Sequence, residues 1–542
     1  MAIPAVEPPV IAAVDGPTRA GARGSRLDPW AIAAVATLIS AAFAGRPSLW
    51  FDEGATISAA ASRTLPQLWT LLGHIDAVHG LYYLLMHGWF AVFPPTEFWS
   101  RVPSALAIGG AAAGVVVFTK QILGPIEGRV TAVCAGLMFA ILPRVTWAGV
   151  EARSSALVAA AGVWLTVLLV VATRRNRPRV WVGYALALAV SILLSINVVL
   201  LLPAHAVMLP LLTRVRSAWI RWLASSIVAV GFQTPFLLFA HGQVWQVGWI
   251  SGLNRVLFLD VVHRQYFDYS VPFAVLSGLI LVFAAVRAAL SARRALRLGS
   301  PHPAGSTRRL LLICAAWILV PTGAVLLYSV LVEPIYFPRY LIFTAPAAAV
   351  VLAVCIVAVG RTPRRVGGIV LLFAVAAFPN YYFTQRGPYA KEGWDYSQVA
   401  DLIGAHAAPG DCLLVDNTVP WKPGPIRALL ATRPAAFRGL DDVERGVYGP
   451  EVGALWDGHV AVWLTTAKIN KCTTLWTITD RDPSLPDHQE GKSLPPGNVF
   501  GRSPAYRFPG YLGFRIVERW QFHYSQVVKS QVVKFEVVKP VG

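Results

Sequence analysis

The chain is divided into apolar runs long enough to be membrane-spanning helices, separated by short polar segments. Of its 542 residues, 56% are hydrophobic and only 14% are charged, with a mean hydropathy of +0.56. Soluble domains carry about a quarter charged residues, and a lipid core admits only helices or closed barrels because it cannot hydrogen-bond the backbone. We therefore predict a polytopic α-helical membrane protein. The predicted spans, about eleven in number, are 29–45, 103–120, 130–143, 155–173, 180–197, 199–213, 218–240, 271–289, 310–331, 340–360 and 366–380.

Clusters of arginine between the apolar runs predict the orientation of the chain. Cytoplasmic loops of membrane proteins are enriched in Lys and Arg. With the N-terminus in the cytoplasm, each cluster lies on the cytoplasmic side, so the net charge of +19 indicates membrane topology and anionic lipid rather than nucleic acid. The clusters are Arg174, Arg175, Arg177 and Arg179; Arg214, Arg216 and Arg221; Arg287, Arg293, Arg294, Arg297, Arg308 and Arg309; and Arg361, Arg364 and Arg365.

Three regions follow from this pattern. Residues 1–28, rich in Pro, Ala and Gly, are predicted to be a disordered cytoplasmic tail. Residues 29–380 hold the spans and a long first outer loop, 46–102. Residues 381–542 are predicted to form an extracytoplasmic α/β domain, large enough to bury its own core, with an accessory or acceptor-binding role. The Ala-, Val-, Arg- and Gly-rich composition is typical of a high-GC bacterium such as an actinobacterium, which indicates the inner (plasma) membrane.

Shorter patterns predict elements outside the membrane. In the outer loop, apolar residues at helical spacing predict two interfacial helices, at 65–72 and 81–89; the second is alternatively a further crossing that needs a partner crossing. The C-terminal region is predicted to contain a helix at 397–407, strands at 412–416, 459–465 and 473–479, and an alternating tail at 520–538.

The five cysteines show no metal-type spacing. Cys134, Cys314 and Cys355 lie in apolar runs and are predicted to be small membrane residues. Cys412 and Cys472 lie in the region predicted to be outside the cytoplasm, where a disulfide between them is one option and free thiols are the other.

Two adjacent carboxylates, Asp52 and Glu53, follow the first apolar run within Trp50-Phe51-Asp52-Glu53-Gly54. Charged groups at a membrane boundary are costly to desolvate, so they need a local reason. Taken alone, the pair is more simply explained as a solvated loop at the end of a helix than as a catalytic base.

Further polar segments on the same predicted outer face change that interpretation. The segments are Phe51-Asp52-Glu53, His79-Gly80-Leu81-Tyr82-Tyr83, Arg101 to Leu106, Trp147 to Arg153, and Pro338-Arg339-Tyr340-Leu341. Each is short, but in this order they resemble the GT-C glycosyltransferases, specifically the protein-mannosyltransferase-like group that includes the bacterial aminoarabinose transferases. The resemblance covers residues 29–380 and implies an enzyme that takes a sugar from a polyprenyl phosphate on the extracytoplasmic side. This chain has His79-Gly80-Leu81 where the family commonly has His-Pro-Pro, and Ser155 where the family often has an aromatic residue two positions after Glu-Ala-Arg.

The resemblance implies a role for each charged residue. Asp52 would act as the general base that takes a proton from the acceptor hydroxyl. Glu53 would orient Asp52, hold a neighbouring group or help to bind a metal. Arg153 and Arg339 would stabilise the charge on the leaving phosphate. Without the family, interfacial snorkelling of Arg339 and a helix-end ion pair between Glu151 and Arg153 are the simpler explanations.

The remaining candidates surround these groups. His79 and Tyr340 would bind the donor or its phosphate, and Tyr82, Tyr83 and Glu151 would line the substrate cleft, although tyrosines at this level are also typical of an aromatic belt. No metal is assigned. A divalent metal stays an option, for which the lone histidines His74 and His263 have no ligand-type spacing, and Asp76 is a reserve acid.

We therefore expect an inverting glycosyltransferase. The expected donor is a polyprenyl-phosphate sugar, with mannose as the first choice and arabinose as the second, and the acceptor is a glycolipid, polysaccharide or protein of the cell envelope. Two alternatives stay open. A lipid-linked sugar transporter or flippase would show interrupted helices in two related halves, but we find no internal repeat and the acids lie at one edge. A non-catalytic envelope assembly protein would tolerate changes at Asp52 and Arg153.

Overall fold

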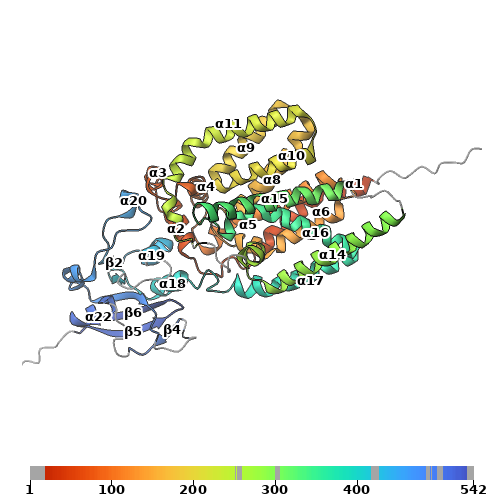
Figure 1. Ribbon diagram of the computed structural model, residues 1–542. Helices are drawn as coiled ribbons and strands as arrows, with labels where there is room; N and C mark the ends of the chain where they lie inside the picture. Colours follow the sequence, from red (N-terminus) through yellow and green to blue (C-terminus); the bar gives the residue numbers. More distant parts are fainter. Residues whose placement is uncertain are drawn as a thin grey trace, which may run out of the picture.

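The computed structural model joins a long helical body to a sheet domain at one end of it (Figure 1). It describes residues 19–250, 252, 259–298, 305–416, 427–483, 489, 491–496 and 504–533. The first helix begins at Arg19, and residues 1–18 of the predicted tail lie outside the described residues.

A helix occupies each predicted span. Among the described residues, seven helices are long and apolar enough to cross a membrane, and three shorter apolar helices lie at 129–141, 178–194 and 196–212. The chain is therefore a multi-pass membrane protein, and the larger number of crossings stays a prediction. The helices are α1 (Arg19–Ala41), α5 (Glu97–Leu123), α6 (Arg129–Ile141), α8 (Ser155–Arg175), α9 (Pro178–Leu194), α10 (Leu201–Leu212), α11 (Arg216–His241), α14 (Val271–Leu298), α15 (Gly305–Leu331), α16 (Ala345–Gly360) and α17 (Pro363–Pro379).

Helix α5 lies at the centre of the body, packed against α1, α6 and α8. Its buried face is rich in alanine and glycine, which let helix backbones approach closely in a membrane. At Gly109, an added Cβ would lie 2.1 Å from Thr37 Oγ1 of α1, so the two helices meet where only a glycine fits.

Short helices connect the spans at the end of the body that faces the sheet domain (Figure 1). Helices α3 (Leu65–His74) and α4 (Gly80–Phe90) confirm both helices predicted in the first outer loop. With 11 residues, α4 is too short to cross a bilayer, which excludes the alternative of a further span. The other short elements are η1 (Ala77–His79), α7 (Pro143–Ala148), η2 (Ile196–Leu200), η3 (Val244–Val247), η4 (Asp260–Arg264), α13 (Gln265–Phe267), η5 (Pro338–Thr344) and η6 (Asn380–Thr384).

The prediction of a loop around Asp52 and Glu53 is wrong, because both residues lie in the first turn of helix α2 (Phe51–Ala60). The free backbone N–H groups and the dipole at a helix N-terminus stabilise negative charge, so this turn favours two acids.

The C-terminal region forms one mixed sheet with the strand order β2-β1-β3-β6-β5-β4, in which β1 runs parallel to β2 and β3 and the remaining pairs are antiparallel. The strands are β1 (Cys412–Val415), β2 (Asp441–Asp442), β3 (Thr474–Asp480), β4 (Lys492–Leu494), β5 (Phe514–Gln521) and β6 (Ser525–Val532). The helices are α18 (Tyr396–His406), α19 (Arg427–Thr432), η7 (Pro434–Phe437), α20 (Gly449–Val452), η8 (Val462–Leu464), α21 (Thr466–Ile469) and α22 (Pro504–Tyr511).

Most predicted elements of this domain are confirmed. Helix α18 and strands β1 and β3 match their predicted segments. The alternating tail predicted at 520–538 contains all of β6 but only the last two residues of β5, and 534–538 lie outside the described residues. The strand predicted at 459–465 is wrong. Its apolar residues Val462 to Leu464 form a 3-10 turn, in which Trp463 and Leu464 are 56% and 73% exposed. A short apolar run does not by itself distinguish a strand from a turn.

Cys412 and Cys472 form a disulfide, which is the first of the two options given for this pair. It ties β1 to the segment before β3. Cys134, Cys314 and Cys355 are free, as predicted for membrane residues.

The sheet domain packs directly on helix α2. Phe51 lies against Trp394 and Trp456, with ring centroids 6.2 and 5.4 Å away. The Ser58 hydroxyl donates a 2.6 Å hydrogen bond to the carbonyl of Leu455. Gly54 faces α19 so closely that a Cβ there would lie 2.3 Å from Thr432 Oγ1. The C-terminal domain therefore helps to hold the acidic turn in place.

We predict that Gly54→Ala destabilises the protein by about 1–3 kcal/mol, because the added methyl group overlaps the Thr432 hydroxyl. Thermal unfolding of the purified protein measures the effect. Thr432→Ala removes the overlapping oxygen and should restore most of the loss. Gly73→Ala in α3, where a Cβ would meet no atom within 4 Å, is the matched control. An unchanged unfolding temperature in Gly54→Ala would contradict this close approach.

Candidate active site

Asp52 lies between two arginines from distant parts of the chain. Arg339 Nη1, from η5, is 2.7 Å from Asp52 Oδ2, and Arg153 Nη2, from the loop before α8, is 3.9 Å from Asp52 Oδ1. The Asp52 side chain is only 15% exposed. Burial alone would raise the pKa of Asp52, but Arg339 and Arg153 outweigh it and hold the pKa below its ordinary value. The carboxylate is therefore charged and stays in reach of a small ligand.

Arg339 is positioned by aromatic rings and by a second acid. Its guanidinium carbon lies 5.7, 5.1 and 6.0 Å from the ring centroids of Trp50, Phe337 and Tyr340. Its Nη1 atom is also 3.8 Å from Glu151 Oε1. Arg339 thus faces both Asp52 and Glu151.

Arg153 is positioned by residues of the first outer loop. It donates 3.1 Å hydrogen bonds to Tyr83 Oη and to His79 Nε2. Tyr83 Oη in turn donates to Asp76 Oδ2 at 2.6 Å. Burial, together with Arg153, lowers the pKa of His79 far below its ordinary value, so the imidazole is neutral. Because Arg153 donates to Nε2, the proton of the neutral ring lies on Nδ1.

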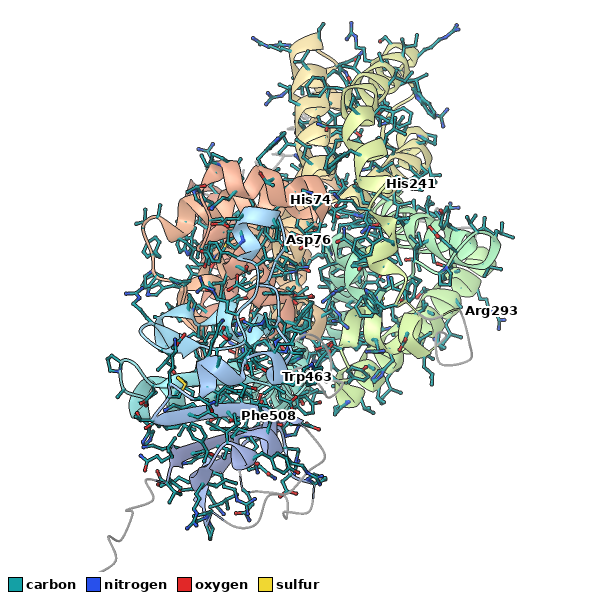
Figure 2. All side chains as sticks on the ribbon, turned by 90° about the vertical axis from the view of Figure 1, so that its left-hand side faces the viewer. His74, Asp76, His241, Arg293, Trp463 and Phe508 are labelled. Atoms are coloured by element: carbon teal, nitrogen blue, oxygen red, sulfur yellow. A yellow bond between two sulfur atoms is a disulfide. The ribbon has the colours of Figure 1, made fainter. Side chains whose placement is uncertain are left out.

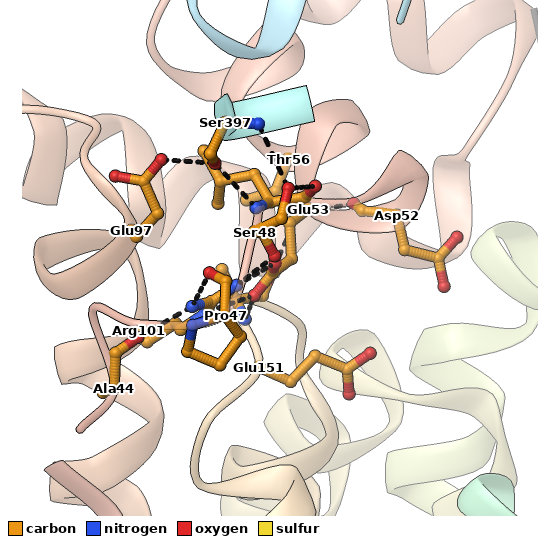
Figure 3. Close-up of polar contacts among 12 residues, drawn as sticks. Ala44, Pro47, Ser48, Asp52, Glu53, Thr56, Glu97, Arg101, Glu151 and Ser397 are labelled. Atoms are coloured by element: carbon orange, nitrogen blue, oxygen red, sulfur yellow. Dashed lines mark hydrogen bonds and ion pairs between the residues drawn. The ribbon is translucent and has the colours of Figure 1, made fainter. Parts of the chain in front are cut away.

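Glu53 is directed away from this cluster and into a buried network (Figure 3). Arg101 donates to both of its oxygens, at 2.8 and 2.6 Å, and both side chains are fully buried. The N–H of Ala152 donates to Glu53 Oε1 at 2.8 Å. Arg101 also donates to the carbonyls of Ala44, Pro47 and Ser48. Figure 3 shows the carboxylates of Asp52 and Glu151 pointing to the opposite side from Arg101.

Several buried polar groups around Asp52 have no hydrogen-bond partner among the described residues. Buried polar groups in folded proteins are nearly always hydrogen-bonded, so a concentration of exceptions indicates a place for a ligand. The unpartnered atoms are both oxygens of Glu151, Tyr82 Oη, His79 Nδ1, Trp50 Nε1 and Lys391 Nζ.

The structure brings the predicted site residues together around Asp52, but Glu53 and Tyr340 each contact an arginine rather than the Asp52 carboxylate. Glu53 is part of the buried network, and Tyr340 contacts the cluster through Arg339. The sequence does not predict two residues of this cluster. Trp50 is one residue of the segment Trp50 to Gly54, and Lys391 lies in a segment typical of an ordinary polar loop.

The side chains considered as metal ligands do not form a site. His74 is exposed, and its Nδ1 atom donates a hydrogen bond to the carbonyl of Thr70. It lies beside α20 of the C-terminal domain (Figure 2). Within the part of the chain that the structure describes, no group of three His, Cys, Asp or Glu side chains could hold a metal ion.

Comparison with known proteins identifies the fold. No protein-family model matches the chain, and no curated protein matches its sequence. The structure is similar to the solved structure of ArnT from Cupriavidus metallidurans bound to undecaprenyl phosphate. The two chains are 15% identical, and the comparison covers 94% of this chain and 98% of that one with a TM-score of 0.55. The chain has the GT-C fold. The apo form of that ArnT matches over the same shares, with 14% identity and a TM-score of 0.54.

The likeness covers the helical body and the C-terminal domain together, so the predicted fold class is confirmed. In the GT-C fold of this chain, the Asp52 cluster lies where the spans meet the C-terminal domain, beside the packing of α2 on α19 (Figure 1).

Proposed function

We propose that the chain is a glycosyltransferase that moves a sugar from a polyprenyl phosphate to a hydroxyl group of a cell-envelope acceptor. The observation that carries this proposal is the Asp52 carboxylate between Arg153 and Arg339, surrounded by buried polar groups without partners. The arrangement supplies a base, two fixed cations and unused hydrogen-bonding groups for a polar ligand.

The two arginines are suited to the phosphate of the donor. Arginine binds phosphate with charge-assisted, often bidentate hydrogen bonds. A bound phosphate competes with Asp52 for Arg339 and neutralises the positive charge that holds the pKa of Asp52 down. Donor binding therefore raises the pKa of Asp52 and makes it a better base.

The proposed reaction is a single displacement. Asp52 takes the proton of the acceptor hydroxyl as its oxygen attacks the anomeric carbon of the sugar. The bond from that carbon to the phosphate oxygen breaks on the opposite face, so the configuration inverts. The electron pair leaves with the polyprenyl phosphate, whose negative charge Arg153 and Arg339 stabilise.

The other residues support this step. Glu53 acts through Arg101 as a positioning residue, because the pair ties α2 to α5 and to the loop that carries Arg153. His79 and Tyr83 orient the guanidinium of Arg153. Tyr340 stands beside Arg339, and Tyr82 and Glu151 offer free polar groups to the substrate.

Three observations support a lipid-borne donor outside the cytoplasm. The chain is a multi-pass membrane protein, and the ArnT with the same fold is described in complex with undecaprenyl phosphate. The Cys412–Cys472 disulfide is of a kind that persists in oxidising compartments. We propose a bacterial inner membrane location, with the N-terminus in the cytoplasm and the C-terminal domain outside, and mannose before arabinose as the transferred sugar.

The proposal is tested with membranes from cells that express the chain and from cells that do not. Labelled polyprenyl phosphomannose and polyprenyl phosphoarabinose are added, and the label in glycolipid, polysaccharide and protein is measured. We expect chain-dependent transfer from at least one donor. Movement of the labelled lipid across vesicles without transfer would favour the flippase alternative instead.

We predict that Arg153→Gln weakens binding of undecaprenyl phosphate about 10- to 100-fold, since a hydrogen bond to a charged group contributes roughly 1.5–3 kcal/mol. Binding is measured on the purified chain in lipid nanodiscs. Arg179→Gln, an exposed arginine at the start of α9, is the control and should bind normally. Equal affinity in the Arg153 variant and the wild type would remove Arg153 from the phosphate site.

A further inference from the structure

Lys391 is a buried lysine in the segment that joins the helical body to the C-terminal domain. The residue lies between η6 and α18 and is 2% exposed. Its Nζ atom has no hydrogen-bond partner among the described residues. Nζ lies 4.6 Å from the ring centroid of Trp147, in helix α7. A lysine is almost never this buried unless a charge or a ligand compensates it.

The compensating charge is Glu151, which follows helix α7 in the loop before α8. Glu151 is fully buried, and neither of its oxygens accepts a hydrogen bond from any residue in the described ranges. Burial raises the pKa of Glu151 to about 7, against the opposing effects of Lys391 and Arg339. Burial likewise lowers the pKa of Lys391 to about 8, against Glu151 and Glu53.

No hydrogen bond joins Lys391 to Glu151, so both side chains can still form hydrogen bonds with a ligand. An ammonium has three N–H donors and no acceptor, whereas a carboxylate only accepts. A hydroxyl group completes both, because it donates to the carboxylate and accepts from the ammonium. Glu151 is also 3.8 Å from the guanidinium nitrogen of Arg339 that contacts Asp52, so such a hydroxyl would lie next to the proposed phosphate site.

The charges around the two groups favour an uncharged ligand. Glu151 faces Lys391 and Arg339 as cations, with Asp52 and Glu53 as anions. Lys391 faces two further cations, Arg101 and Arg386. Arg153 also faces Glu151, so five cationic side chains stand against three anionic ones. One phosphodiester does not offset this surplus of positive charge, and a neutral sugar adds nothing to it. An added cation would be buried without a partner, which is costly.

We propose that Glu151 and Lys391 form the subsite for the sugar ring of the donor and select a neutral, hydroxylated sugar over one that carries a cationic amino group. This inference rests on the proposed glycosyltransferase function. It assigns a substrate class to the site and makes Lys391, a residue of the link to the C-terminal domain, part of the substrate cleft.

The test compares two donors that differ in one group. Polyprenyl phosphoarabinose and its 4-amino-4-deoxy analogue compete with labelled undecaprenyl phosphate for the purified full chain in nanodiscs. We expect the amino analogue to bind at least about 10-fold more weakly, because a like charge beside Lys391 is unfavourable. Lys391→Met should bring the two donors within about 3-fold of each other. Lys391→Arg should keep the preference, and Glu151→Gln should increase it.

The outcomes separate this inference from the proposed function. Equal binding of both donors to the wild type overturns the inference, as does an unchanged preference in Lys391→Met, which a purely structural role would give. Undecaprenyl phosphate without a sugar monitors the fold and the phosphate site in every variant. If that lipid does not bind to the wild type, the proposed function itself fails.

Discussion

Asp52→Asn is expected to lower the turnover of sugar transfer by about 10²- to 10⁴-fold, the range over which a positioned general base contributes. Asparagine keeps the size of the side chain but cannot take a proton from the acceptor hydroxyl. The substitution also removes the anion that pairs with Arg339 at 2.7 Å. Undecaprenyl phosphate then no longer competes for that arginine, so its affinity should be equal or higher.

The measurement pairs transfer from a labelled polyprenyl-phosphate sugar with lipid binding by the same preparation. Loss of transfer with retained binding separates a catalytic role from misfolding. Asp401→Asn serves as a control, because Asp401 lies on α18 with a side chain that is 64% exposed and pairs with Arg433. Transfer by Asp52→Asn at the wild-type rate would remove the proposed base.

The largest expected effect on stability is that of Arg101→Met. The Arg101 and Glu53 side chains are both fully buried, and the methionine would leave the Glu53 carboxylate without its partner. Removing one partner of a buried ion pair costs roughly 3–5 kcal/mol, more than the pair itself contributes. The carbonyls of Ala44, Pro47 and Ser48 also lose their donor.

Thermal unfolding of the single variants and of the double variant Arg101→Met with Glu53→Leu measures this cost. The double variant should be more stable than Arg101→Met alone, because no buried charge is left unpaired. Arg445→Met, at an arginine that is 54% exposed and 3.8 Å from Asp457, should change stability by less than about 1 kcal/mol. A single Arg101→Met variant as stable as that control would contradict the buried network.

The sequence was informative where physical constraints leave a repeating pattern. Long apolar runs and the arginine clusters between them located the helices of the body, because a lipid core forces helices and charge bias orients them. The order of the polar motifs predicts Asp52, Arg153 and Arg339 on one face, and in the structure each arginine has a nitrogen within 4 Å of an Asp52 carboxylate oxygen.

The remainder depended on tertiary contacts that leave no local pattern. Helix α2 has only 10 residues and a mixed composition, so its sequence predicts a loop. Glu53 and Arg101 are 48 residues apart, and nothing in their spacing predicts a buried pair. Lys391 is buried against Trp147 of α7, which is distant in the chain, and the polar segment around Lys391 does not indicate this contact.

The most direct test of the central claim is a cryo-EM structure of the full chain in lipid nanodiscs with undecaprenyl phosphate. The account predicts that the phosphate binds between Arg153 and Arg339, and that Asp52 is released from Arg339. A lipid phosphate bound elsewhere, with the Asp52–Arg339 ion pair intact, would contradict it.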